Sequence, residues 1–290
     1  MGRRRKKTEF EISLRENQQA YWRYWNQLAE LAMGCFRYTG LPDMVESRTI
    51  ENALCRAGKA VYFDDEVMGN LCLEFSDGGR FDVNGYPILR RAYSYYNNYT
   101  RLLKPSNSVV IYNNLTRTNT WYAISQFARR LYVYDRIADI NVNAQKTPVA
   151  LVANENERLT VLNAYKEFDG NAPVIHLTDN FNLNSIQVLK TDAPFVADKI
   201  WYQKQQIYNE ALTFLGIRNV NQSKKERMVT AEVDIANIDA NYNRTVKLEC
   251  RQRAIEKINK MFGTNIEVEF IGDELVAQVL AGEQMGRVSG

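Results

Sequence analysis

Apolar residues recur at steps of three and four positions in several segments of the chain, a spacing that predicts amphipathic helices. In the first of these segments, residues 16–37, Tyr21, Trp25 and Leu28 lie on the apolar stripe, and Gly40 and Pro42 follow it as stop signals. The same spacing predicts further helices at residues 49–56, 118–140, 193–217 and 249–262. In the helix at 193–217 we expect Pro194 in the first turn and Gly216 at the C-terminal cap.

Between the second and third predicted helices the pattern changes to short runs rich in β-branched and aromatic residues. These runs are AVYFDD (60–65), VMGNLCLEF (67–75), RFDVNGYPILRRAYSYY (80–96) and SVVIYNN (108–114). Turn residues interrupt them at Asp77-Gly78-Gly79, Asn84-Gly85 and Pro105-Ser106-Asn107. Four or five antiparallel strands, curled into a small barrel or sheet, are predicted here.

The two longest central helices, each roughly 30 Å long, bracket a small mixed unit at residues 141–192. In this unit the pattern predicts strands at 147–153, 172–177 and 185–190 and a helix at 157–168. A basic loop is expected at residues 219–230, and a strand at 265–271 and a short helix at 273–280 end the chain. Segregated helices and strands of this kind predict the α+β class.

Charge limits the kind of nucleic-acid contact that the chain can make. The 290 residues carry 37 basic and 34 acidic side chains, a formal net charge of +3, which is a small excess for a protein that grips DNA tightly. The excess gathers around residues 218–227 and in an N-terminal arm, residues 1–15. The arm carries five adjacent cations: Arg3, Arg4, Arg5, Lys6 and Lys7. Adjacent cations repel one another and resist burial, so the arm is either a phosphate contact or a solvated tail.

Cysteine and tyrosine usage adds two expectations. Cys35, Cys55, Cys72 and Cys250 form no CxxC pair, so free thiols are predicted. Many of the 17 tyrosines cluster at Tyr93, Tyr95, Tyr96 and Tyr99, which suits either a subunit interface or an aromatic sheet face. No apolar run approaches the roughly 20 residues of a membrane span, and no apolar segment of a signal peptide follows the basic start. A soluble protein made in a cytoplasm is expected.

Catalytic and cofactor motifs are missing from the sequence. The single histidine, His176, lies in an apolar predicted strand without partners for a metal site or a catalytic triad. Gly58-Lys59 lacks the glycine spacing of a phosphate-binding loop. We therefore expect no enzyme activity, no cofactor and no metal.

Five strings in the second half of the chain occur in a recognisable order: NVNAQKTPV (141–149), DGNAPVI (169–175), KTDAPFVADK (190–199), TFLGI (213–217) and KKERMVT (224–230). Together they resemble the portal protein, also called upper collar or head–tail connector, of the phi twenty-nine-like small podophages. The N-terminal half matches that family in layout only. The chain is also shorter than those relatives at its C-terminus.

The resemblance implies a phage portal fold that assembles as a dodecameric ring at one capsid vertex, through which DNA is packaged, retained and ejected. It implies an SH3-like wing at residues 16–117, stem helices at 118–140 and 193–217, and a small α/β clip at 141–192. It further implies a channel loop at 218–246 and a return to the wing and crown at 247–290. Capsid protein, lower collar or tail proteins and a separate packaging ATPase would be its partners in the virion.

The same resemblance assigns roles to individual residues. Lys190, Lys199, Lys224 and Lys225 match positions that project into the DNA channel, and the basic arm matches one that some relatives use to hold a packaging RNA. Lysine contacts to phosphates would be independent of DNA sequence. Two other functions stay open: a free nucleic-acid-binding packaging factor, and another collar or adaptor ring of the virion.

Overall fold

The computed structural model describes residues 9–144, 149–151, 186–188, 194–218 and 230–274 of the chain. It contains two compact units, which are described separately. The first unit comprises Met1–Val133 and Lys204–Gly290, and the second comprises Tyr134–Gln203. The predicted helix at 157–168, the predicted strand at 172–177 with His176, and most of the predicted loop at 219–230 lie outside the described residues.

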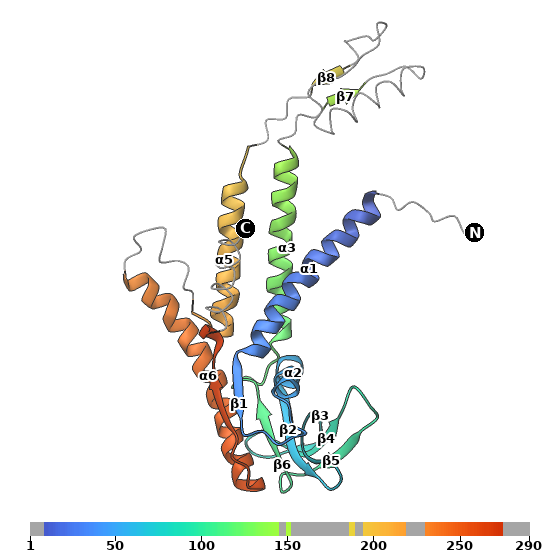
Figure 1. Ribbon diagram of the computed structural model, residues 1–290, viewed down its shortest axis with the longest axis vertical. Helices are drawn as coiled ribbons and strands as arrows, with labels where there is room; N and C mark the ends of the chain where they lie inside the picture. Colours follow the sequence, from blue (N-terminus) through green and yellow to red (C-terminus); the bar gives the residue numbers. More distant parts are fainter. Residues whose placement is uncertain (1–8, 145–148, 152–185, 189–193, 219–229, 275–290) are drawn as a thin grey trace, which may run out of the picture. The chain divides into compact units, whose positions relative to one another are not determined.

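A five-stranded antiparallel sheet forms the core of the first unit, as the strand pattern predicts (Figure 1). Its strands are β2 (Lys59–Asp65), β3 (Gly69–Phe81), β4 (Pro87–Tyr93), β5 (Thr100–Leu103) and β6 (Ser108–Tyr112), in the order β5-β4-β3-β2-β6. Helix α2 (Ser47–Ala57) contacts β2 and β3. The buried core of the sheet consists of Val61, Phe63, Leu71, Phe75, Ala92, Leu103 and Val110.

The turns of this sheet agree in part with the sequence. At Asn84-Gly85 the chain turns with Gly85 at φ 71°, and the Asp82 carboxylate accepts hydrogen bonds from the backbone N–H groups of Asn84 and Tyr86. The predicted turn at residues 77–79 is wrong, because these residues lie within β3. The pairing of β3 with β4 shifts in register between Gly78 and Phe81, which accommodates the two glycines. Strand β5 was not predicted separately, because four residues are too few for a clear alternation.

A second, two-stranded sheet pairs β1 (Phe36–Thr39) with β9 (Glu267–Phe270), from opposite ends of the chain (Figure 1). The first helix was predicted at residues 16–37, but α1 (Glu9–Gly34) begins and ends earlier, so residues 9–15 of the predicted arm are helical. Phe36 fits the helical spacing, yet its ring packs edge-on against Phe270 at a centroid distance of 5.4 Å. Pairing with a distant strand, which local spacing cannot show, decides the end of the helix.

The two long central helices are confirmed as α3 (Trp121–Ala144) and α5 (Ala197–Leu215). Helix α5 ends at Gly216, with φ 93°, in a motif where the N–H of Ile217 bonds the carbonyl of Leu212. Pro194 precedes α5 rather than lying in its first turn. In the second unit, the side chain of Asn141 donates to the Pro194 carbonyl and accepts from the Val196 N–H, at 2.9 and 3.1 Å.

Helix α6 (Thr230–Phe262) is longer than the sequence predicts. The family resemblance implied a loop up to residue 246, and the apolar spacing predicted a helix only from residue 249. The structure continues the helix back to Thr230. The second unit also contains β7 (Val149–Leu151) paired antiparallel with β8 (Ile186–Val188), in agreement with the strands predicted at 147–153 and 185–190.

Gly58, the cap of α2, gives a first testable prediction. Its φ is 76°, and a Cβ there would lie 2.7 Å from the carbonyl oxygen of Arg117. We expect Gly58→Ala to lower the free energy of unfolding by roughly 2 kcal/mol in urea titrations. Gly263→Ala is the matched control, because Gly263 also caps a helix with positive φ but has open space around its Cβ position. Equal losses in the two variants would show that the contact with Arg117 does not matter.

Candidate functional site

Lys199 is the one predicted channel lysine that the described residues include. Lys190, Lys224, Lys225 and the basic arm from Arg3 to Lys7 lie outside them. Lys199 is exposed in the first turn of α5, and no carboxylate within the described residues forms an ion pair with it. A cation near a helix N-terminus is opposed by the helix dipole. Stability of α5 therefore does not explain why a lysine occupies this position.

The faces of α5 divide as the sequence predicts. Ile200, Ile207 and Ala211 are buried, whereas Lys199 and Gln203 are exposed one turn apart. The exposed face of the helix therefore presents an uncharged amide beside the lysine ammonium.

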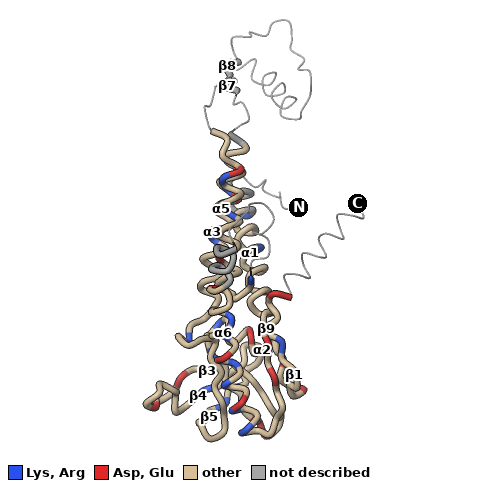
Figure 2. The backbone as a smooth tube through the Cα atoms, turned by 90° about the vertical axis from the view of Figure 1, so that its left-hand side faces the viewer, with Lys and Arg blue, Asp and Glu red and all other residues tan. Residues whose placement is uncertain are grey.

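Several basic groups of the first unit form ion pairs with acidic side chains. Arg130 of α3 forms an ion pair with Glu210 of α5 at 2.8 Å, and both side chains are about half exposed. Figure 2 shows Lys and Arg interspersed with Asp and Glu over β3, β4 and β5. Charges of both signs are therefore mixed over this sheet.

Large apolar side chains are exposed in the second unit, and the sequence reading missed them. The indole of Trp201, for example, is 65% exposed. The others are Ile137, Ile140, Val142, Phe195 and Tyr202. The apolar spacing of each helix does not predict their exposure, because these residues lie beside the regular stripe. Exposed apolar side chains that adjoin one another can mark a contact with another protein.

The tyrosine cluster serves two purposes. Tyr99 donates a 2.6 Å hydrogen bond to Asp65, which also accepts from Arg101 and from two backbone N–H groups. The hydrogen bond from Tyr99 is the largest of the effects that hold the pKa of Asp65 well below its usual range. Tyr93 donates to Glu74 at 3.1 Å. Tyr93 and Tyr99 therefore stabilise the sheet, whereas Tyr96 is 82% exposed and available for contacts.

A buried ionic network joins α6 to the sheet and to α2. The guanidinium of Arg251 bonds both carboxylate oxygens of Glu51, at 2.7 and 2.8 Å, and both side chains are at most 1% exposed. Tyr38 donates to the same carboxylate, and Arg251 also donates to the carbonyls of Asn113 and Lys247. Lys247 is buried nearby and donates to the Phe214 carbonyl at 2.7 Å. Local sequence patterns do not reveal this network, because bonded partners such as Glu51 and Arg251 lie 200 positions apart.

The chemical expectations drawn from cysteines are confirmed. All four thiols are free, and burial raises the pKa of Cys35, Cys55 and Cys72 to about 12. Among the described residues, no three His, Cys, Asp or Glu side chains converge to hold a metal ion. None of the described helices combines the length and apolar character needed to cross a bilayer.

Comparison with known proteins gives one family match over nearly the whole chain. The sequence pattern of the family described as Phage Connector (GP10) matches residues 5–275. This span includes the described helix α5, with Lys199, and most of the basic arm.

Three solved structures that match the chain at low sequence identity come from phage proteins and a gene transfer agent. A chain of the portal and tail of native bacteriophage P68 is 16% identical, with 91% of this chain and 90% of that chain covered and a TM-score of 0.49. A chain from the virion of a native gene transfer agent particle is 12% identical, with coverages of 96% and 89% and a TM-score of 0.47. An HK97 family phage portal protein from Corynebacterium diphtheriae is 10% identical, with coverages of 89% and 94% and a TM-score of 0.40.

Proposed function

The chain belongs to the phage connector, or portal, family, and we propose that its copies form a ring around a channel for double-stranded DNA. Connector proteins are structural proteins of bacteriophages and not enzymes. The family match over residues 5–275 carries the proposal. The exposed apolar side chains of the second unit support it, because a ring would bury them between neighbouring copies.

The finer proposal is a dodecamer at one capsid vertex, at the head–tail junction of a phi twenty-nine-like phage. In it, the long helices α3 and α5 are the stem, residues 141–192 are the clip, and the five-stranded sheet belongs to an SH3-like wing. The ring serves genome packaging, retention and ejection. Capsid protein, lower collar or tail proteins and the packaging ATPase attach to it, and the ATPase supplies the energy for translocation.

Lysine rings are the proposed means of contact with DNA. Repetition around the ring turns Lys190, Lys199, Lys224 and Lys225 each into a circle of positive charge. Every lysine that neutralises a phosphate releases counterions and adds affinity, so a wall that was basic throughout would hold the DNA in place. Exposed Gln203 beside Lys199, and the neutralised pair of Arg130 and Glu210, fit a wall that centres the duplex and lets it slide.

The basic arm, Arg3 to Lys7, is proposed to contact phosphates as well. A packaging RNA is the partner that the resemblance suggests. Gel-shift measurements with the purified protein and a variant lacking residues 1–7 would test the arm, and equal RNA affinity of the two proteins would contradict it.

Electron microscopy of the purified protein tests the ring. We expect particles with a central hole, and a mass measurement of the assembly gives the number of copies. A monomer or dimer without a hole that nevertheless binds nucleic acid would favour the second function, a free packaging factor.

For the lysines, we predict that Lys190→Ala combined with Lys199→Ala leaves rings intact but changes the passage or retention of DNA. Loss of two rings of charge removes phosphate contacts, so the retained genome should escape more easily as salt rises. The measurement is the amount of DNA packaged and retained in particles assembled with the variant. Lys104→Ala, at an exposed lysine of the β5–β6 turn, is the control. Unchanged packaging and retention in the double variant would remove the assigned role.

A further inference from the structure

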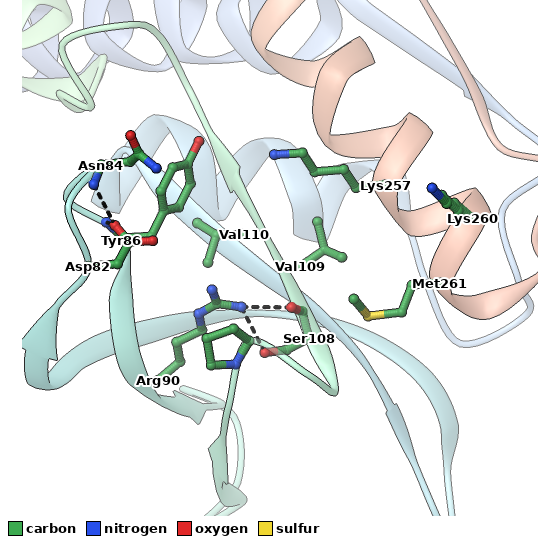
Figure 3. Close-up of a pocket in the computed structure, with 11 residues that line it drawn as sticks. Asp82, Asn84, Tyr86, Arg90, Ser108, Val109, Val110, Lys257, Lys260 and Met261 are labelled. Atoms are coloured by element: carbon green, nitrogen blue, oxygen red, sulfur yellow. Dashed lines mark hydrogen bonds between the residues drawn. The ribbon is translucent and has the colours of Figure 1, made fainter.

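A cavity of about 580 Å³ lies in the first unit between the sheet and the last turns of α6 (Figure 3). The hairpin between β3 and β4 contributes Asp82 and Tyr86, strand β4 contributes Arg90, strand β6 contributes its first residues, and α6 contributes Lys257, Lys260 and Met261. The volume is in the range of ligand sites in proteins. None of the lysines assigned to the proposed channel lines this cavity.

Arg90 brings a buried positive charge to the cavity wall. The side chain is 4% exposed, and its Nη1 donates to the carbonyl and hydroxyl oxygens of Ser108 at 2.7 and 2.9 Å. Within the described residues no carboxylate lies at ion-pair distance from it. In Figure 3 its other amino group points away from Ser108, toward Tyr86 and Val110. A buried charge is costly unless it is paired, so this guanidinium favours an anion in the cavity.

The surrounding charges are also unbalanced. Lys257 and Lys260 are exposed, and neither forms an ion pair with a described residue. Lys257 lies over the ring of Tyr86 at 5.6 Å, and the guanidinium of Arg117 covers the same ring at 4.9 Å. Asp82 is the one acidic residue of the lining, and its carboxylate already accepts two backbone hydrogen bonds. Three cations therefore line the cavity, and Asp82 is the one carboxylate among the lining residues.

The cavity is lined by apolar surface as well as by charge. Val109 and Val110 form a buried apolar wall, and Met261 is 44% exposed beside them. Phosphates of a nucleic acid would use the cations but not this surface. A peptide can use both, by placing one acidic and one apolar side chain in the same cavity.

We propose that this cavity is a docking site for an acidic peptide segment of a partner protein. A carboxylate of the segment binds the free side of the Arg90 guanidinium, and an apolar side chain packs on Val109, Val110 and Met261. Lys257 and Lys260 bind further carboxylates at the rim. The site goes beyond the DNA channel, and nothing in its chemistry depends on ring formation.

Fluorescence anisotropy of a labelled peptide with alternating Leu and Glu residues tests the proposal on the full-length protein. The peptide should bind, and the same peptide with Gln in place of Glu should bind at least tenfold more weakly. Lys257→Glu should weaken binding of the acidic peptide about tenfold, which corresponds to about 1.4 kcal/mol. Arg48→Glu is the matched control, because Arg48 is an exposed cation of the same unit outside the cavity, and it should leave the affinity within about twofold.

Met261→Gln separates the peptide from a phosphate ligand. It should weaken binding of the acidic peptide about threefold, while binding of a short DNA duplex or of inorganic phosphate stays unchanged. The proposal is overturned if the wild-type protein ignores the acidic peptide, or if Arg48→Glu weakens binding as much as Lys257→Glu. It is also overturned if duplex DNA or phosphate displaces the peptide and Met261→Gln has no effect, since the site would then recognise phosphate.

Discussion

Replacement of Arg251 by alanine is expected to lower the free energy of unfolding by about 3–5 kcal/mol, because it leaves the buried carboxylate of Glu51 without its counter-charge. Glu51 is fully buried, and the guanidinium of Arg251 supplies two of its hydrogen bonds. The same change removes the donors to the carbonyls of Asn113 and Lys247. Urea unfolding of the unassembled chain, followed by circular dichroism, measures the loss.

Arg253→Ala is the control for this prediction. Arg253 is on the same helix and pairs with Glu249 at 2.9 Å, but both side chains are at least half exposed. An exposed pair of this kind contributes at most about 1 kcal/mol. A second variant, Arg251→Met with Glu51→Leu, removes both charges and should recover much of the stability. Similar small losses for Arg251→Ala and Arg253→Ala would show that the buried network does not stabilise the fold.

The second large effect is a dependence of stability on pH through Lys247. Burial is the main cause that lowers the pKa of this lysine to about 8, from an ordinary value of 10.5. Between these two values the unfolded chain binds the proton and the folded chain does not, so stability rises with pH. Below pH 8 both states are charged and the folded protein bears the full cost of the buried ammonium. A shift of this size corresponds to a gain of about 3 kcal/mol between pH 8 and 10.5.

Comparison with Lys247→Met measures this contribution together with the smaller effect of Lys247 on the neighbouring thiols of Cys35 and Cys55. The wild-type protein should gain about 3 kcal/mol relative to the variant between pH 7.5 and 10.5 in urea titrations. Lys260→Met changes an exposed lysine of the same helix. The free energy of unfolding of this variant should depend on pH as that of the wild-type protein does. If the free energy of unfolding of Lys247→Met also changed with pH as in the wild-type protein, Lys247 would not be buried in the folded protein.

Local patterns predict those elements whose stability depends on nearby residues. Helices α3 and α5 and the strands β2, β4 and β6 appear close to their predicted places, because apolar periodicity and turn residues determine them. The end of α1 and the extent of α6 differ from the predictions for the opposite reason. Phe36 lies in a strand because it pairs with Phe270 of β9. The asparagine-rich first part of α6 is helical although it has no regular apolar stripe.

The candidate sites differ in the same way. The channel lysines could be named because a family resemblance assigns them, and charge alone would have left Lys199 as a solvated surface group. The cavity beside Arg90 could not be found from the sequence. Its lining comes from residues 82–110 and 257–261, which meet only through the packing of β6 and α6. Strand β4 carries two adjacent arginines, and the sequence does not show that Arg90 is buried whereas Arg91 is exposed.

The contacts of Asn141 bear on how the protein tolerates a change in length between α3 and α5. By bonding Pro194 and Val196, its amide fastens the end of α3 to the start of α5. These two hydrogen bonds therefore hold the ends of the intervening segment together. Closing a longer loop adds only about 0.6 kcal/mol for each doubling of its length. A change in the length of the segment between residues 145 and 193 is therefore expected to have little effect on α3 and α5, because Asn141 and its two partners lie outside that segment.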